Sequence, residues 1–243
     1  MRHSDSVIVN SQSGERYLCG DRPSQNVVVI ENGIEARSFA FDESGRKRMR
    51  AAWCIADDTP VVGCVARLDP IKDHRTLLHA FALLRRSRPD ARLICVGGGT
   101  GPYAGELRAL ARDLQVDAAT QWIAREPRLR DFYSALDVAC LSSLSEGFPN
   151  VLAEAMACGV PCVSTDVGDA RRILSPSDYL VPVGDPQYLA KALGAALAQG
   201  RAHSEQRAER IRRDFSPESM AEKTERALNA ALERRNARLA KAT

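Results

Sequence analysis

Between residues 61 and 199 the chain alternates short apolar runs with amphipathic segments of helical period, and this alternation constrains the fold more than any other feature. Runs such as VVGCVA and RLICVG are apolar on both faces, as expected of strands buried within a parallel sheet. Repeated strand–helix units predict helices on both sides of that sheet. We therefore expect an α/β fold with a doubly wound, Rossmann-like parallel sheet, whose ligands bind beyond the carboxyl ends of the strands.

The positions of the individual elements follow from the same periodicity. Strands are expected over residues 61–66, 92–97, 120–124, 138–141, 161–165 and 179–183, and helices over residues 74–86, 103–113, 129–136, 150–157 and 186–199. Two short strands, 7–9 and 27–30, precede this region, and Asn32-Gly33 after them is expected to form a turn with positive φ. Near the other end, residues 203–243 have a helical period, and Ser216 and Pro217 within them predict the start of a helix.

The composition is that of a globular protein with one sizeable core, since 44% of the 243 residues are apolar and 27% are charged. A net charge of +3 and an aromatic content of 5% argue against nucleic acid as a partner. No apolar run reaches the length of a membrane span, and the first residues, MRHSDSVIVN, lack the layout of a signal peptide. We expect a cytoplasmic location.

Cysteine and histidine give no sign of a metal site. The seven cysteines contain no C-x-x-C pair, and four of them, Cys64, Cys95, Cys140 and Cys162, fall within expected strands, where a free thiol behaves as a small apolar group. The four histidines form no cluster with the spacing of metal ligands. We expect reduced cysteines, no metal and no cofactor.

The polar loop before the expected helix 150–157 is a candidate anion site. The helix begins just after Gly147-Phe148-Pro149, so the backbone N–H groups of Asn150 and Val151 face the loop. Such a helix start attracts phosphate through its free N–H groups and through the helix dipole. A negatively charged ligand is therefore the first expectation.

Two carboxylates flank this helix start: Glu146 lies in the loop and Glu154 lies one turn into the helix. Ionised carboxylates accept hydrogen bonds from sugar hydroxyls, so the pair suits a ligand that carries hydroxyls as well as phosphates. The alternative is that Glu146 is only a charge partner of the helix start and that Glu154 is a solvated helix residue.

Two further strand ends carry candidate binding residues. Arg67 and Lys72 follow the expected strand 61–66, where a guanidinium and an ammonium would neutralise a diphosphate, although both also fit ordinary surface cations. After the strand 92–97, the glycine run that begins with Gly97 and Gly98 permits close backbone approach to a ligand.

The segment 137–168 resembles the signature of the retaining GT-B glycosyltransferases of glycosyltransferase family 4, E-G-F-x-x-x-x-x-E-A followed by G-x-P-V-V and T-D-x-G. The matching residues are Glu146-Gly147-Phe148, Glu154-Ala155, Gly159, Pro161, Thr165-Asp166 and Gly168. The segment from Arg67 to Lys72 resembles the G-R-L-x-x-x-K-G of the same family, and Asn32-Gly33 followed by Phe39 resembles the entry to its C-terminal domain. The resemblance implies the C-terminal, donor-binding half of a GT-B fold.

The resemblance also implies roles for individual residues. Glu154 is expected to hold the ribose hydroxyls of the donor, and Glu146 the hydroxyls of the transferred sugar. The expected catalytic residues are Arg67, Lys72 and Glu146, and the expected donor-binding residues are Glu154, Gly147, Phe148, Pro149, Asn150, Val151, Gly97 and Gly98. The expected donor is a UDP-sugar or GDP-sugar, bound without a metal.

Three positions depart from the family pattern. Glu31 replaces a proline before Asn32, and Ala66 replaces a glycine before Arg67. After Gly168 the family commonly has a second glycine and a glutamate shortly before an isoleucine, whereas this chain has Asp169-Ala170-Arg171-Arg172-Ile173. The contacts of that turn are therefore not transferred to this chain.

The resemblance covers about residues 25–230, which is one of the two Rossmann-like domains of the family. We interpret residues 1–44 as the interdomain junction and first strand, 45–214 as the nucleotide-sugar-binding domain and 215–243 as a C-terminal crossover helix. An N-terminal acceptor-binding domain is then an expected partner, and the chain would be a fragment, a truncated product or one subunit of a split enzyme.

Two functions of different classes stay open. One is transfer of a sugar from a nucleoside-diphosphate sugar to a glycan or lipid-linked acceptor with retention of configuration, with peripheral binding at the inner membrane face as one setting. The other is a nucleotide-sugar-binding module that is inactive without a separate acceptor-binding domain. A nicotinamide dehydrogenase is disfavoured, because the chain lacks a G-x-G-x-x-G fingerprint and the acidic residue beyond it.

Overall fold

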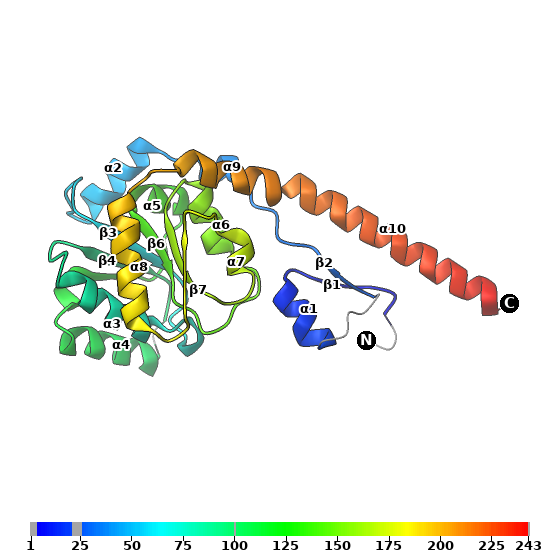
Figure 1. Cartoon of the computed structure of the whole chain (residues 1–243), viewed down its shortest axis with the longest axis horizontal. Helices are drawn as coiled ribbons and strands as arrows, with labels where there is room; N and C mark the ends of the chain where they lie inside the picture. The colour runs from blue at the N-terminus through cyan, green and yellow to red at the C-terminus, as the bar shows by residue number, and fades with distance from the viewer. Residues whose placement is uncertain (1–3, 21–25, 100, 243) are drawn as a thin grey trace.

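The computed structural model describes residues 4–20, 26–99 and 101–242. Its centre is a six-stranded parallel sheet with the strand order β5-β4-β3-β6-β7-β8 (Figure 1). The strands are β3 (Val61–Val65), β4 (Arg92–Val96), β5 (Thr120–Ile123), β6 (Val138–Leu141), β7 (Cys162–Thr165) and β8 (Tyr179–Val181). The chain builds outward from β3 to β5, returns to β6, and then builds outward in the other direction. The direction therefore changes between β3 and β6, and ligands of open α/β sheets bind at such a point, beyond the carboxyl ends of the strands.

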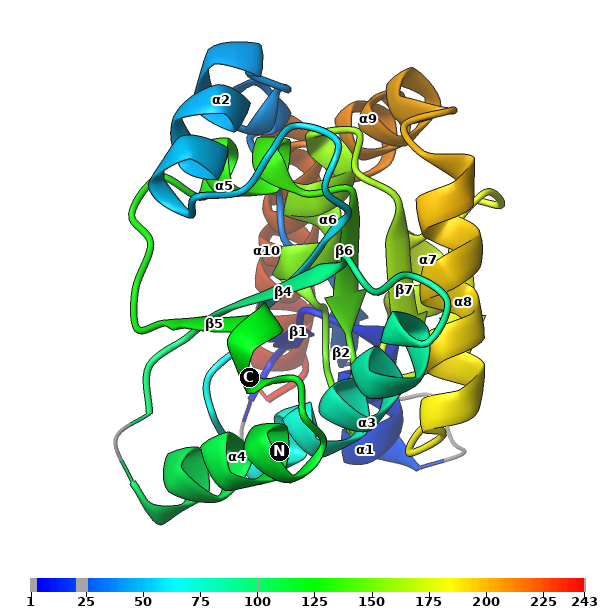
Figure 2. The same ribbon diagram turned by 90° about the vertical axis from the view of Figure 1, so that its left-hand side faces the viewer.

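Helices cover both faces of the sheet (Figure 2). One face packs against α3 (His74–Arg85), α4 (Pro102–Asp113) and α8 (Pro186–Gln199), and the other against α2 (Glu43–Ala52), α5 (Leu129–Ala135), α6 (Asn150–Ala157) and α9 (Ser204–Asp214). Alternate strand residues serve alternate faces: Val61 belongs to the core beneath α2, α5 and α6, whereas Val62 and Cys64 belong to the core beneath α3 and α8. The expected doubly wound sheet is confirmed.

Local sequence signals set the ends of several helices. The Asp185 side chain accepts hydrogen bonds from the backbone N–H groups of Gln187 and Tyr188, so it caps α8, which has Pro186 at its first position. Gly200 ends the same helix with φ of 58°. The short 3-10 helix η2 (Pro70–Lys72) leads into α3 through Asp73, whose φ of 44° turns the chain sharply between the two.

A second, smaller unit precedes the sheet domain. β1 (Val7–Val9) pairs in parallel with β2 (Val27–Val29), and α1 (Gln12–Cys19) lies between them in the chain. Figure 1 shows this unit beside α10 (Pro217–Ala242), away from the six-stranded sheet. The contact includes an ion pair between Arg238 and Asp5 at 3.1 Å. We refer to β1, α1 and β2 as the N-terminal unit.

The structure corrects one local prediction. Neither Asn32 nor Gly33 has positive φ. Gly33 is instead required for close packing, because a Cβ atom there would lie 2.6 Å from the Cα of Pro217 at the start of α10. The expected helix start at Ser216 and Pro217 is confirmed, with the Ser216 hydroxyl accepting from the N–H of Ser219 at 3.1 Å.

Other differences concern boundaries and missed helices. The expected strands and helices of the sheet domain agree with the observed elements to within one or two residues. Three helices were not predicted: α1, α2 and the short α7 (Ala170–Ile173). All seven cysteines are free, and the four placed in strands are buried, as expected.

Candidate functional site

Four loops meet at the carboxyl edge of the sheet, around the point where the strand order changes direction. They follow β3, β4, β6 and β7 and comprise residues 66–73, 97–99, 142–149 and 166–169. Every expected site residue except Glu154 and Val151 lies in these loops or, for Asn150, at the first position of α6. We call this region the strand-end site.

Lys72 and Glu146 form the central charged contact of the strand-end site. Their Nζ and Oε1 atoms are 2.6 Å apart, and both side chains are mostly shielded from solvent, with exposed fractions of 19% and 12%. The Ser143 hydroxyl donates to the same Oε1 atom at 2.6 Å. Among the described residues no hydrogen bond to Oε2 is made, so this oxygen is free to accept from a ligand.

Hydrogen bonds between the loops fix this ion pair in place. The Ser142 hydroxyl donates to the backbone carbonyl of Lys72 at 2.9 Å, and the N–H of Leu144 donates to the carbonyl of Ile71 at 2.8 Å. From β7, the Thr165 hydroxyl donates to the carbonyl of Ser143 at 2.7 Å. The loops after β3, β6 and β7 therefore form one rigid support, whose buried hydroxyl groups are all satisfied.

Arg67 lies apart from the ion pair. It follows β3 directly and its side chain is exposed. Within the described part of the chain its guanidinium forms no ion pair, so its positive charge is not neutralised by a neighbouring carboxylate. The structure brings Lys72 and Glu146 together but leaves Arg67 available to an incoming anion.

The glycine run after β4 packs against the loop that carries Arg67. Gly97 has φ of 154°, and a Cβ atom there would lie 1.8 Å from the carbonyl oxygen of Ala66. Gly98 accepts a hydrogen bond from the N–H of Leu68 at 3.2 Å. The close approach made by these glycines is thus to the protein backbone, and contact of Gly97 and Gly98 with a ligand stays a prediction.

The start of α6 has no side-chain cap. Pro149 occupies the N-cap position, and no side chain accepts from the first turn. Within the described chain, no hydrogen bond is donated by the backbone N–H of Asn150 or Val151, as expected of an anion-binding helix start. Phe148 is buried against the ring of Phe215 at 5.4 Å and anchors the loop that leads into the helix.

Glu154 faces a tyrosine that the sequence did not single out. The Tyr133 hydroxyl, from α5, donates to Oε2 of Glu154 at 2.8 Å. Burial raises the pKa of the Glu154 carboxyl above its ordinary value, and the hydrogen bond from Tyr133 offsets part of that rise. The interpretation of Glu154 as a freely solvated helix residue is wrong, because its carboxylate is partly buried and held by this contact.

The N-terminal unit contacts the strand-end site through the first residues of α1. The carboxylate of Asp169, in the loop after β7, accepts from the backbone N–H groups of Gln12 at 3.0 Å and Ser13 at 3.4 Å. The Ser13 hydroxyl donates to the carbonyl of Glu146 at 3.3 Å. Asp169 is one of the departures from the family pattern, and its partner is 157 positions away in the chain, so sequence reasoning alone could not name it.

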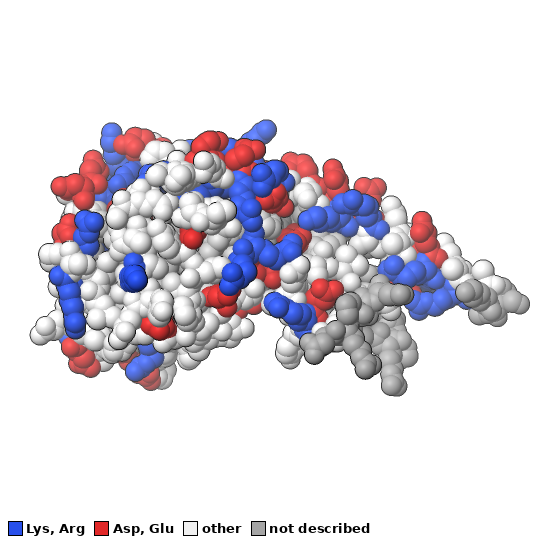
Figure 3. All heavy atoms as spheres, in the orientation of Figure 1, with Lys and Arg blue, Asp and Glu red and all other residues white. Residues whose placement is uncertain are grey.

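Two other residues that depart from the family pattern, Glu31 and Arg172, form an ion pair with each other. Glu31 is 8% exposed and lies between Arg172 of α7, at 2.5 Å, and Lys223 of α10, at 2.8 Å. Figure 3 shows lysine and arginine side chains gathered at this junction of the sheet domain and the N-terminal unit. Burial alone would raise the pKa of Glu31, but the hydrogen bond and charge of Lys223 and the charge of Arg172 outweigh it, so the pKa is lowered.

Three further findings concern metal binding, membrane spans and a second cavity. Among the described residues, no group of three or more histidine, cysteine, aspartate or glutamate side chains is placed to hold a metal ion. No helix of the described chain is long and apolar enough to cross a membrane. A cavity of about 750 Å³ lies between α9 and the residues preceding β8, at the amino edge of the sheet, and shares no residue with the strand-end site.

The fold defines the class of the protein. It matches the crystal structure of Anabaena HepE in complex with UDP and glucose with a TM-score of 0.87 and 22% identity, over 94% of this chain and 64% of the HepE chain. With its loops at the change of strand order, the chain has the fold of the C-terminal half of a GT-B glycosyltransferase. A family model described as glycosyl transferases group 1 matches residues 45–215, so the chain belongs to this family.

Named relatives agree with this assignment. The chain is 34% identical to a D-inositol 3-phosphate glycosyltransferase of Acidothermus cellulolyticus, over 81% of this chain and 46% of that protein. It is 32% identical to the GDP-mannose-dependent alpha-(1-6)-phosphatidylinositol monomannoside mannosyltransferase of Mycolicibacterium smegmatis, over 80% of this chain and 53% of that protein. The chain thus spans about half the length of the curated relatives it matches.

Proposed function

We propose that this chain is the donor-binding half of a retaining glycosyltransferase, which transfers a sugar from a nucleoside-diphosphate sugar to a glycan or lipid-linked acceptor. One observation carries the proposal: the Lys72–Glu146 pair lies beside the uncapped start of α6, where the strand order changes direction. A cation and free N–H groups suit a diphosphate, and a carboxylate oxygen without a partner suits a sugar hydroxyl. The names of HepE and of the mannosyltransferase, which mention UDP and GDP-mannose, support a nucleotide-sugar donor.

In this proposal the two carboxylates have different tasks. Glu154 accepts hydrogen bonds from the ribose hydroxyls of the nucleotide, and Glu146 accepts from the hydroxyls of the transferred sugar through its free Oε2. Gly147, Phe148 and Pro149 form the loop that carries the sugar to the helix start. Gly97 and Gly98 approach the donor from the neighbouring strand end.

The proposed chemistry is breakage of the bond between the anomeric carbon and the bridging oxygen of the diphosphate. The electron pair of that bond stays with the oxygen, where negative charge develops in the transition state. Arg67, Lys72 and the N–H groups of Asn150 and Val151 would already be aimed at this charge, so they stabilise the transition state more than the ground state. These groups take the role that a divalent ion has in other glycosyltransferases.

The acceptor belongs to a second domain in this proposal. Half of the length of the curated relatives lies outside the match, and the two-stranded sheet of the N-terminal unit is too small to be stable alone. A second Rossmann-like domain would extend that sheet and hold the acceptor; a lipid-linked acceptor would place the enzyme at the inner membrane face. Without that domain we expect slow hydrolysis of the donor at most, and the alternative function is a nucleotide-sugar-binding module.

Calorimetry on the isolated chain tests the binding step. UDP or GDP should bind in buffer that contains EDTA, and added Mg²⁺ should not increase the affinity. Circular dichroism under the same conditions verifies that the protein is folded. A folded chain that binds neither nucleotide, or binds only with Mg²⁺, would contradict the proposed donor site.

The stereochemistry is tested after the chain is joined to a cognate acceptor-binding domain. Transfer should then occur, and NMR of the product should show that the anomeric configuration of the donor is retained. An inverted product would refute the proposed reaction while leaving the binding result intact.

A further inference from the structure

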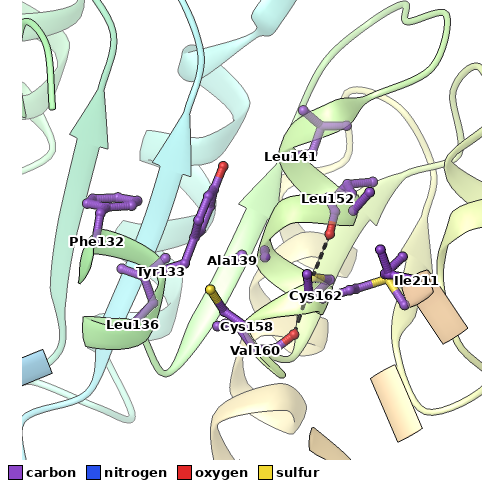
Figure 4. Packing of buried hydrophobic residues seen from close by; sticks show 14 of the residues in the cluster. Phe132, Tyr133, Leu136, Ala139, Leu141, Leu152, Cys158, Val160, Cys162 and Ile211 are labelled. Carbon is purple, nitrogen blue, oxygen red and sulfur yellow. Dashed lines mark hydrogen bonds between the residues drawn. The ribbon is translucent and has the colours of Figure 1, made fainter. Parts of the chain in front are cut away.

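Tyr133 occupies a position that its apolar neighbours alone do not explain. Its side chain is 1% exposed and lies within the core between α5 and α6. In the view of Figure 4 the ring stands among Phe132, Leu136 and Ala139, and its hydroxyl lies level with Leu141, the last residue of β6. A buried phenol requires a hydrogen-bond partner, and here that partner is the Glu154 carboxylate at 2.8 Å.

The tyrosine ring has little freedom to move. Phe39 and Phe132 contact it edge-on, with ring centroids 6.1 Å and 5.7 Å away. Burial, together with the charge of Glu154, raises the pKa of the Tyr133 hydroxyl well above its ordinary value, so the hydroxyl keeps its proton and acts as the donor. The contact therefore has one direction and one geometry.

One of the two oxygens of the Glu154 carboxylate has no hydrogen-bond partner among the described residues. Only Oε2 has a hydrogen-bond partner among the described residues, and Oε1 accepts from no protein group there. A carboxylate at the end of a glutamate side chain otherwise rotates among several conformers, and fixing one oxygen also fixes the direction of the other. The protein thus supplies an oriented acceptor oxygen on α6, one turn beyond the helix start that borders the strand-end site.

We infer that Tyr133 is a positioning residue for nucleotide recognition: it orients the Glu154 carboxylate so that Oε1 accepts from the ribose hydroxyls. This inference rests on the proposed function, because it assumes that Glu154 faces the ribose. It adds a residue on α5 that lies outside every motif quoted for the family. Tyr133 does not touch the ligand and acts only through Glu154.

The surroundings of Glu154 make its ionisation depend on this contact. Tyr133 of α5 is the titratable group that hydrogen-bonds it, and two buried thiols lie nearby: Cys158, the C-cap of α6, and Cys162 of β7. From η1 (Ala36–Phe39), α7 and α9, which also pack against α6, no described charged side chain forms an ion pair with Glu154. Loss of the tyrosine hydroxyl should therefore raise the pKa of Glu154 further, so the neutral acid persists to a higher pH.

The experiment compares Tyr133→Phe with the unaltered chain in calorimetric titrations with UDP and GDP and with their 2′,3′-dideoxy analogues. The variant should bind the ribonucleotide about tenfold more weakly, as expected for one lost hydrogen bond to a charged group. It should bind the dideoxy analogue with unchanged affinity. The ratio of the two affinities should also begin to fall at a higher pH in the variant, because Glu154 is protonated earlier.

Tyr179→Phe is the matched control. Its hydroxyl donates to Oε1 of Gln199 at 3.0 Å, at a distance from the strand-end site, so its loss should change neither affinity. If Tyr133→Phe lowers stability too far for titration at 25 °C, the same comparison is made at lower temperature. In the Glu154→Ala background, which has no acceptor for the tyrosine hydroxyl, adding Tyr133→Phe should cause no further loss.

The outcomes distinguish failure of the proposed function from failure of the inference about Tyr133. An unaltered chain that binds no nucleoside diphosphate overturns the proposed function, and the inference with it. If the unaltered chain binds, equal losses of ribonucleotide and dideoxy analogue in Tyr133→Phe, or no loss of either, overturn the inference alone. A further loss of ribonucleotide affinity in the Glu154→Ala background would also show that Tyr133 does not act through Glu154.

Discussion

At the scale of single residues, the Lys72–Glu146 pair links two roles that the sequence assigns separately. Without a ligand the ammonium is neutralised by the carboxylate at 2.6 Å, so a diphosphate has to compete for Lys72. The free Oε2 of Glu146 lies on the same group, so a sugar hydroxyl has an acceptor even while the pair is intact. In the proposed donor site, removing Glu146 would therefore release Lys72 to the diphosphate but take away the acceptor for the sugar hydroxyl.

Alanine replacements at the two glutamates should divide nucleotide from sugar recognition. Glu154→Ala should weaken bare UDP or GDP by about 1.5–3 kcal/mol, the value of a lost charged hydrogen bond. Glu146→Ala should weaken the sugar nucleotide by a similar amount and leave the bare nucleotide no weaker, because Lys72 is released. Titration calorimetry measures both, with exposed Glu222→Ala as a control, and equal losses of bare-nucleotide affinity in the two variants would refute the division.

At the scale of elements, the strands and the helices α6 and α8 could be predicted because their apolar period is a local property of the sequence. The helix α2 could not, since its sequence ESGRKRMRAA is dominated by charge. Tertiary contacts stabilise it instead: buried Arg50 binds Asp137 at 2.6 Å and three backbone carbonyls of the loop before β3. Such contacts become visible only when distant segments are placed together.

The same distinction applies to the site. Its location could be predicted, because the carboxyl ends of parallel strands meet at one edge of a sheet. Its internal contacts could not: Tyr133 and Glu154 lie on different helices, and Asp169 meets α1 from the other end of the chain. These pairings depend on the packing of α5 against the sheet and on the path of the N-terminal unit.

Two glycine-to-alanine replacements, at Gly63 in β3 and at Gly105 in α4, test how tightly β3 is packed. A Cβ atom at Gly63 would lie 2.3 Å from Cδ1 of Leu136, which is fully buried, so Gly63→Ala should destabilise the fold by about 1–3 kcal/mol. Gly105, within α4, has nothing near its Cβ position, and Gly105→Ala should stabilise by up to about 1 kcal/mol through helix propensity. Urea unfolding monitored by circular dichroism measures both, and equal effects would contradict the packing argument.

At the scale of the whole molecule, Glu31 joins three parts of the chain. It lies just after β2 and binds Arg172 of α7 and Lys223 of α10, so it ties the N-terminal unit to the sheet domain and to the last helix. The Asp169 contact with α1 adds a second attachment nearby. The placement of the N-terminal unit therefore depends on a few polar contacts.

The pH dependence of stability should reveal the contribution of Glu31. Its pKa is lowered in the folded state, so its stabilisation is present above the ordinary carboxyl pKa and is lost as the pH falls through the lowered value. Glu31→Gln should thus cost about 1–3 kcal/mol at pH 7, and the difference should shrink as the pH falls below about 4.5. Urea unfolding between pH 7 and 4 measures this, with exposed Glu106→Gln as control; a difference independent of pH would argue against a charged role.

The effect of Arg67 and Lys72 on catalysis has to be measured in a two-domain enzyme, because the acceptor is expected to bind in another domain. In the enzyme joined to a cognate acceptor-binding domain, Arg67→Ala or Lys72→Ala should lower kcat by about 10²-fold or more, since each removes a charge aimed at the leaving diphosphate. Arg108→Ala, an exposed cation on α4, should leave kcat unchanged. Full activity after both cation replacements would show that leaving-group stabilisation comes from elsewhere.

The contact between Glu31 and Arg172 has a consequence for the exchange of modules between related enzymes. By the family resemblance, a relative carries proline at the first of these positions and glutamate near the second. A chimera that takes its first 44 residues from such a relative would leave Arg172 and Lys223 facing each other without the carboxylate that separates them. An exchange of domains between such enzymes would therefore have to transfer the residues at positions 31 and 172 together, although the domain boundary near residue 45 separates them in the chain.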